Sequence, residues 1–204
     1  MYTLEVKTVI GKSNLIDVIA GTNRGLLANA GQQQAILAAI ANLEDFNPTP
    51  HPLAASNLLE GNWRLLYTTS KALLNIDRLP FYQLGQIYQC IRVETNSVYN
   101  IAEIYGIPAL EGLVSVVAKF VPVSQSRVQV KFQRSIIGLQ RLIGYTTPGN
   151  FIQQIESGHF QNKLAFDFPI QSQQQQGWLD ITYLDDDLRI ARGNEGSVFV
   201  LSKT

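Results

Sequence analysis

The chain has 204 residues, which is enough for one domain with a well-filled core and short for two. Its 16 basic and 16 acidic residues cancel, so no net charge favours nucleic acid as a partner. A single cysteine, Cys90, excludes an internal disulfide framework, and no apolar run approaches the roughly 20 residues of a membrane-spanning helix.

Two helical segments are expected before the first cluster of prolines. Apolar residues recur at spacings of three and four around residues 4–20 and again over 32–46. This spacing is typical of amphipathic helices. The second helix must end before Asn47-Pro48-Thr49-Pro50-His51-Pro52, because proline cannot continue a helix.

From Gly61 onward the apolar period changes from helical to alternating, which is typical of β-strands. Strand-like runs cover 61–69, 87–93, 97–105, 113–121, 127–133, 160–168, 178–184, 187–193 and 197–202. Eight or nine short strands without intervening helices form an antiparallel sheet that either stacks on itself or closes, and we favour closure. We therefore expect one mainly β domain over 1–204, with N-terminal helices at 1–47 packed on an antiparallel β-barrel at 58–204.

A tryptophan and an arginine are expected to close this barrel. Gly61-Asn62-Trp63 opens the first strand, and two arginines lie in the run 187–193. A bulky indole can plug one end of a small barrel while a guanidinium stacks over its face. Alternation places Arg192 on the apolar side of its strand and Arg189 on the other side. We therefore predict that Gly61, Trp63 and Arg192 hold the barrel shut without contacting a ligand, and that Arg189 lies outside.

Inward-facing positions on the strands are candidates for the wall of the lumen. A small barrel has room for side chains or for one slender ligand. Alternation divides each strand into two faces, but it does not show whether the inner face is packed or encloses a cavity. The predicted lumen residues are Tyr67, Ile87, Ile91, Val128, Val130, Phe132, Ile181 and Tyr183.

The chain contains no motif from which an enzyme mechanism could be built. It lacks a Gly-x-Ser-x-Gly sequence, a phosphate-binding loop, a Cys-x-x-Cys pair and a dinucleotide fingerprint. Three carboxylates at Asp185-Asp186-Asp187 could ligate a hard cation, but calcium loops need oxygens at alternating positions around a glycine. A tight turn between two strands is the favoured interpretation. We expect no catalytic residue, no metal and no cofactor.

Charge is balanced overall but not locally. Between Gly112 and Ile155 five basic residues occur and no acidic one, and the apolar stretch 135–145 lies within this window. Cations beside apolar side chains are typical of interfacial membrane attachment. The same stretch could instead be a buried crossover helix, or a lid that moves. The predicted membrane contacts are Arg134, Ile136, Ile137, Leu139, Arg141, Leu142 and Ile143.

The chain resembles the plastid lipid-associated protein, or fibrillin (plastoglobulin), family of cyanobacteria and plastids. The resemblance spans essentially the whole chain. The motifs that carry it most specifically are Leu58-Leu59-Glu60-Gly61-Asn62-Trp63-Arg64-Leu65-Leu66-Tyr67-Thr68-Thr69-Ser70 and Thr182-Tyr183-Leu184-Asp185 followed by Leu188-Arg189-Ile190-Ala191-Arg192-Gly193. Further shared motifs lie at 21–26, 43–50 and 85–89.

The resemblance implies a lipocalin-like barrel that binds or carries hydrophobic lipids without catalysis, with a link to photoprotection. The implied partners are an isoprenoid, quinone, carotenoid or acyl lipid and a peripheral membrane surface. Because the first residues do not look like a transit peptide, the implied location is the cytoplasmic side of a cyanobacterial thylakoid, or lipid globules; a plastid is implied if a transit peptide has been removed. Two alternatives stay open, namely a membrane-surface structural protein whose barrel is filled with side chains, and a barrel that isomerises or cyclises its lipid.

Overall fold

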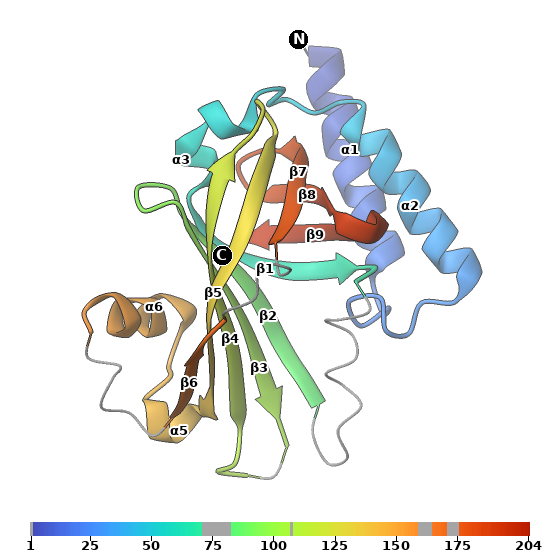
Figure 1. Ribbon diagram of the computed structural model, residues 1–204. Coiled ribbons are helices and arrows are strands. Elements are labelled where there is room, and N and C mark those ends of the chain that lie inside the picture. Colours follow the sequence, from blue (N-terminus) through green and yellow to red (C-terminus); the bar gives the residue numbers. More distant parts are fainter. Residues whose placement is uncertain (1, 71–82, 107, 159–164, 171–175) are drawn as a thin grey trace.

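The chain begins with a pair of helices. The computed structural model describes residues 2–70, 83–106, 108–158, 165–170 and 176–204 (Figure 1). Helix α1 (Tyr2–Ile19) packs against α2 (Ala30–Glu44), close to the two segments expected. At the start of α2, the Asn29 side chain accepts a hydrogen bond from the Gln32 N–H at 2.9 Å, and the Gln32 side chain accepts one from the Asn29 N–H at 3.0 Å. This capping box satisfies N–H donors that the first turn leaves free.

Eight strands close into a barrel in which all neighbours are antiparallel. In order round the barrel they are β1 (Gly61–Thr68), β2 (Gln83–Arg92), β3 (Ser97–Tyr105), β4 (Gly112–Pro122), β5 (Arg127–Leu139), β7 (Gln176–Leu184), β8 (Leu188–Gly193) and β9 (Val198–Lys203). Strand β9 returns to pair with β1, so neither is an edge. The expected mainly β fold with N-terminal helices and a closed antiparallel barrel is confirmed.

The ninth strand, β6 (Ala165–Pro169), extends the wall beyond the end of β7. Strand β5 pairs with β7 along Arg127–Lys131 and with β6 along Arg134–Gly138. The expected strand at 160–168 is therefore present from Ala165, and its residues 160–164 lie outside the described residues. Two short helices, α5 (Gln140–Ile143) and α6 (Pro148–Glu156), precede β6 in the chain and lie on the outside of the barrel (Figure 1).

The opposite end of the barrel is covered by the short helices η1 (Pro52–Ala54) and α3 (Ser56–Leu59). Figure 1 shows α3 near the ends of β4 and β5. The Leu53 N–H donates to the Gln125 carbonyl oxygen at 3.3 Å, which ties η1 to the turn between these strands. Leu59 is buried among the inward-facing side chains of the barrel. A last short helix, η4 (Asn194–Gly196), joins β8 to β9.

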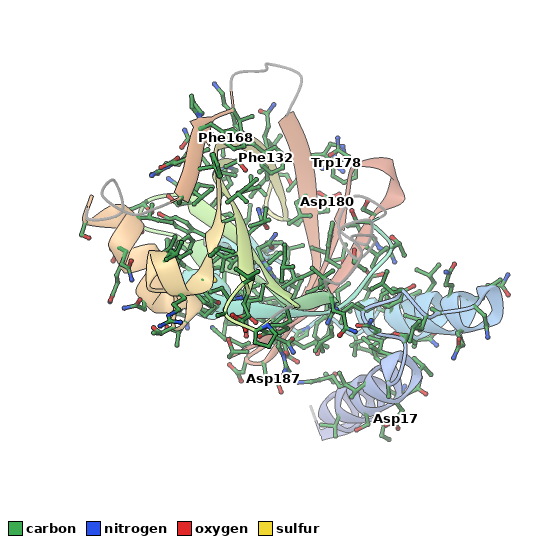
Figure 2. The ribbon with its side chains drawn as sticks, turned by 90° about the horizontal axis from the view of Figure 1, so that it is seen from below. Asp17, Phe132, Phe168, Trp178, Asp180 and Asp187 are labelled. Atoms are coloured by element: carbon green, nitrogen blue, oxygen red, sulfur yellow. The ribbon has the colours of Figure 1, made fainter. Side chains whose placement is uncertain are left out.

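Buried apolar side chains form three clusters rather than one. The first lines the barrel interior. The second lies between α1–α2 and the outer faces of β1, β7, β8 and β9, and it includes Leu43 and Ile190. The third lies between α5–α6 and the outer faces of β2 to β5, and it includes Ile101 and Phe151. The two helical pairs stand on different sides of the barrel (Figure 1 and Figure 2). Several strands are therefore apolar on both faces.

Candidate functional site

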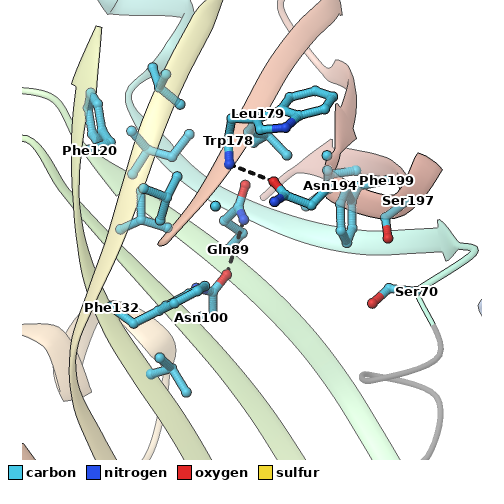
Figure 3. Close-up of a pocket in the computed structure, with 18 of the residues that line it drawn as sticks. Ser70, Gln89, Asn100, Phe120, Phe132, Trp178, Leu179, Asn194, Ser197 and Phe199 are labelled. Atoms are coloured by element: carbon cyan, nitrogen blue, oxygen red, sulfur yellow. Dashed lines mark hydrogen bonds between the residues drawn. The ribbon is translucent and has the colours of Figure 1, made fainter. Parts of the chain in front are cut away.

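The barrel interior contains a cavity of about 1120 Å³ (Figure 3). Ligand pockets usually have volumes of roughly 300–1,000 Å³, so this cavity is slightly larger than the usual range. It runs from Leu53 and Leu59 at the covered end to Phe168 and Ile170 beside β6. Its apolar wall includes Leu65, Ile87, Ile91, Val98, Phe120, Val128, Val130, Phe132, Ile181, Phe199 and Leu201. Such a wall is suited to a long apolar molecule, because contact with water is replaced by contact with hydrocarbon.

The cavity wall contains most of the lumen residues expected from strand alternation. The residues that line it are Ile87, Ile91, Val128, Val130, Phe132 and Ile181. Tyr67 and Tyr183 do not line it, because both are buried on the outside of the barrel beneath α1 and α2. The prediction is wrong for these two tyrosines.

Two β-bulges explain the misplacement of the tyrosines. In β1 the pairing register shifts between Leu65 and Tyr67, and in β7 it shifts between Ile181 and Tyr183. An extra residue in a strand moves every later side chain to the opposite face of the sheet. Leu65 and Ile181 therefore face the cavity, whereas the tyrosine two positions later in each strand faces the helices.

Trp63 meets two cations where the first and last strands join. The indole is fully buried, and its Nε1–H donates to the Leu59 carbonyl oxygen at 3.0 Å. The guanidinium carbon of Arg189 lies 5.0 Å from a ring centroid of the indole, and Nζ of Lys203 lies 5.2 Å from it. Both distances are within the range of cation–π attraction. The expected arrangement of indole and guanidinium is present, but Arg189 supplies the guanidinium.

The prediction that Arg192 covers Trp63 is wrong. Arg192 lies on the outer face of β8, where its Nε and Nη2 groups donate to the two carboxylate oxygens of Glu44 in α2 at 2.9 and 2.7 Å. These hydrogen bonds raise the pKa of Arg192. Arg189 and Arg192 do face opposite ways, as predicted. The error is in the choice of face, because the apolar side of β8 packs against α1 and α2 rather than into the lumen.

Gly61 leaves room for the lysine at this junction. Its backbone φ of 132° is in a region that favours glycine, and a Cβ at this position would lie 3.0 Å from Cε of Lys203. Lys203 passes through this space, and its Nζ donates to the Leu58 carbonyl oxygen at 2.7 Å. Gly61 thus lets the last strand close against the start of the first.

Three polar side chains from three strands form a line on the cavity wall. Arg189 of β8 donates through Nη2 to Oε1 of Gln89 in β2, and Nε2 of Gln89 donates to Oδ1 of Asn100 in β3 at 3.1 Å (Figure 3). Arg189 is only 1% exposed, and this burial lowers its pKa to about 9, so the guanidinium stays charged at neutral pH. Alternation could have identified Gln89, which lies between the inward-facing Ile87 and Ile91 in the sequence.

Comparison with known proteins settles the family. Residues 10–202 match the model of the PAP_fibrillin family. The chain belongs to the PAP_fibrillin family. It is 37% identical to the "Light-induced protein, chloroplastic" of Solanum tuberosum, over 94% of this chain and 66% of that relative. The family resemblance drawn from the sequence is confirmed.

Two further relatives of this PAP_fibrillin chain carry descriptive names. It is 35% identical to the "Plastid-lipid-associated protein, chloroplastic" of Citrus unshiu and 33% identical to the "Chromoplast-specific carotenoid-associated protein, chromoplastic" of Cucumis sativus. Each match covers 94% of this chain and 67% of the relative. The chain therefore spans about two thirds of the length of these curated relatives. No solved structure matches it.

The stretch 135–145 of this PAP_fibrillin barrel is not a crossover helix. Residues up to Leu139 continue β5, and only the single helical turn α5 follows. Ile136 and Ile143 are fully buried in the cluster beneath α6, so their prediction as membrane contacts is wrong. Arg134 is held by the carboxylate of Asp167 in β6, with Nε 2.6 Å from Oδ1.

The other predicted membrane contacts lie at or near the surface. Ile137, Arg141 and Leu142 are exposed, and Leu139 is half-buried. Ile137 pairs across the sheet with Phe166 of β6, whose side chain is 78% exposed. Phe168, also exposed, lines the cavity near Phe132, and both are labelled in Figure 2, which views the molecule from this end. Ile137, Phe166 and Phe168 are called the apolar rim below; sequence reasoning missed its two phenylalanines.

The run of three aspartates lies in a turn between β7 and β8. The Asp185 N–H donates to the Leu188 carbonyl oxygen at 3.0 Å, and Oδ1 of Asp185 accepts from the Leu188 N–H at 2.8 Å. Lys12 of α1 forms ion pairs with Asp185 and Asp187. Across the part of the chain that the structure describes, no three His, Cys, Asp or Glu side chains group as metal ligands would.

None of the helices in the described ranges combines the length and the apolar character needed to cross a membrane.

Proposed function

We propose that the barrel of this PAP_fibrillin chain binds a hydrophobic lipid and carries or stores it without catalysis. The observation that carries the proposal is the cavity of about 1120 Å³, whose wall is mainly apolar. A buried methylene contributes roughly 0.8 kcal/mol, so an eighteen-carbon acyl or prenyl-like chain gains on the order of 13 kcal/mol. Association and ordering offset roughly 4–15 kcal/mol of this gain. Carriage with micromolar or weaker affinity is therefore expected.

The names of the relatives support a plastid-type lipid as the ligand. One is called plastid-lipid-associated and another carotenoid-associated, and both are described as plastid proteins. We extend the proposal to isoprenoid, quinone, carotenoid or acyl lipids at a thylakoid surface or at lipid globules. In a cyanobacterium this surface is the cytoplasmic side of the thylakoid. A role in photoprotection would follow if the bound lipid is a pigment or an antioxidant quinone.

Two experiments test binding directly. Protein purified from its source cells is extracted with organic solvent, and the extract is analysed by mass spectrometry for bound lipid. The delipidated protein is then titrated with a prenylquinone, a carotenoid and a long-chain fatty acid. Binding with about one ligand per chain is expected for at least one class. An extract without lipid, together with no binding of any class, would contradict the proposal and favour a membrane-surface role without a ligand.

We further propose that the apolar rim meets the membrane surface. The rim lies where β5 and β6 extend the barrel wall, and Phe168 belongs to both the rim and the cavity wall. A lipid could therefore pass from the acyl layer to the cavity without crossing water, since apolar side chains enter the boundary between headgroups and acyl chains.

Flotation with liposomes tests the membrane contact. Phe166→Asp is expected to reduce flotation several-fold, because a carboxylate placed in the apolar boundary is costly. Val123→Asp is the matched control, since Val123 is also exposed but lies in the turn before β5, at the end that η1 covers. Equal flotation of both variants and the unmodified protein would remove the rim as the attachment site.

A further inference from the structure

One charged side chain in the cavity wall lacks the partner that a buried charge normally has. Arg189 is 1% exposed, and among the described residues it forms no ion pair with a carboxylate. Within the described part of the chain, its side chain makes one hydrogen bond, from Nη2 to Oε1 of Gln89, and its Nε–H has no acceptor. Buried charges are ordinarily paired, because removing an ion from water is expensive. Stacking on Trp63 offsets only part of this cost.

The neighbours of Arg189 leave donors, rather than acceptors, available on the cavity wall. Gln89 turns its oxygen toward Arg189 and its amide nitrogen toward Oδ1 of Asn100. The oxygens of both amides are thereby engaged, and the Asn100 amide N–H groups have no acceptor within the described residues. The guanidinium has five N–H donors and uses one of them in this network. A site with spare donors and a positive charge binds an acceptor, and an anionic acceptor most strongly.

We propose that Arg189, with Gln89 and Asn100, is a head-group site for a single-chain lipid carboxylate, and this rests on the proposed function. The carboxylate would accept hydrogen bonds from the guanidinium and from the Asn100 amide, while the apolar chain lies along the valine, isoleucine and phenylalanine side chains of the cavity wall. A bound hydrocarbon has no hydrogen-bond acceptor and would displace water from the cavity. The guanidinium would then have neither an anion nor water as a partner. The cavity therefore selects amphiphiles by their polar end.

Ligands with one chain length and different head groups test the inference. Dissociation constants of the delipidated protein are measured for octadecanoic acid, octadecanol and methyl octadecanoate by displacement of a fluorescent fatty-acid probe at neutral pH. A hydrogen bond to a charged group contributes about 1.5–3 kcal/mol, which corresponds to an affinity difference of about ten- to a hundred-fold. The acid is expected to bind more tightly than the ester by at least about tenfold.

Two variants on the same strand locate the preference. Arg189→Met keeps the unbranched apolar stem of the side chain but removes the charge. It is expected to bring the ratio of the affinities for acid and ester close to one, with little change in the affinity for the ester. Arg192→Met is the matched control on the outer face, and it is expected to keep the ratio of the unmodified protein. Asn100→Leu removes a donor but not the charge, and it should lower the ratio by a smaller factor.

The head-group inference and the proposed function can fail separately. If all three ligands bind the unmodified protein equally, lipid binding stands and the head-group inference is overturned. If none of the three binds, the head-group inference is overturned, and the titration with a prenylquinone and a carotenoid decides whether the proposed function also falls. This comparison needs no variant, so it decides the question even if Arg189→Met does not fold. A preference for the acid that Arg189→Met retains would also overturn the assignment to this site.

Discussion

Replacement of Trp63 by alanine should be among the most destabilising single changes in the described part of the barrel. The indole is fully buried, donates to the Leu59 carbonyl oxygen and lies beside two cations. Truncation of a buried tryptophan costs about 3–5 kcal/mol through lost burial and the cavity that remains. The Leu59 carbonyl loses its donor, at about 1 kcal/mol or more, and Arg189 loses its stacking partner. These terms are not additive, and we expect a total of about 4 kcal/mol or more.

The second tryptophan provides the matched control. Trp178 is partly exposed and stacks with Arg127, whose guanidinium carbon lies 4.4 Å from its ring centroid. Because a cation–π contact at an exposed site contributes roughly 0.5–1 kcal/mol, Trp178→Ala should cost about 1–2 kcal/mol including lost burial. Trp63→Phe should fall between the two, since it keeps an aromatic ring but loses the hydrogen bond to Leu59.

Urea unfolding followed by far-ultraviolet circular dichroism measures these differences without relying on the fluorescence that the substitutions remove. In thermal unfolding, a loss of 1 kcal/mol lowers the Tm of a domain of this size by about 2–4 °C. Trp63→Ala should therefore lower the Tm by roughly 8–16 °C. If Trp63→Ala and Trp178→Ala reduce the free energy of unfolding by the same amount, the indole is not the element that closes the barrel.

Two further predictions concern the outer surface and alkaline pH. Glu44→Gln removes the ion-pair partner of Arg192. Because this pair is partly solvent-exposed, we expect the free energy of unfolding in urea to fall by only about 1 kcal/mol. A loss above about 3 kcal/mol would show that this pair is essential for docking α2. Burial, together with the hydrogen bond to Glu156, raises the pKa of Tyr99 from its ordinary value of 10.0 to about 12. The stabilisation from its neutral form is therefore complete below pH 10 and is lost as pH rises toward 12. Tyr99→Phe should flatten the fall of the urea midpoint between these pH values, and an unchanged slope would contradict this assignment.

The alternating pattern predicted the barrel because it is repeated over many strands, each of which contributes independently. It also identified cavity positions such as Val128 and Val130, which precede the register shift in β5. It failed at Tyr67 and Tyr183 because a single extra residue in a strand has no signature in the pattern itself. The phase after such a residue can be assigned only from the pairing with the neighbouring strand.

The choice between Arg189 and Arg192 shows a different limit. The prediction of Arg192 assumes that the apolar side of a strand faces the inside of the barrel, which holds when the outside faces water. In this fold α1 and α2 cover that outside, and Leu188 and Ile190 pack against them. A signal was available, because two amphipathic N-terminal helices must bury their apolar faces against some outer surface of the sheet. The partner of Arg192, Glu44, lies 148 residues away and could not be assigned without the fold.

Blocking the cavity tests lipid carriage most directly. Val130 lines the cavity, and the next residue, Lys131, is exposed. Val130→Trp should reduce the amount of fatty acid or prenylquinone bound per folded chain at least tenfold, whereas Lys131→Trp should bind as the unmodified protein does. Equal binding by both tryptophan variants would contradict the claim that the lipid lies inside the barrel.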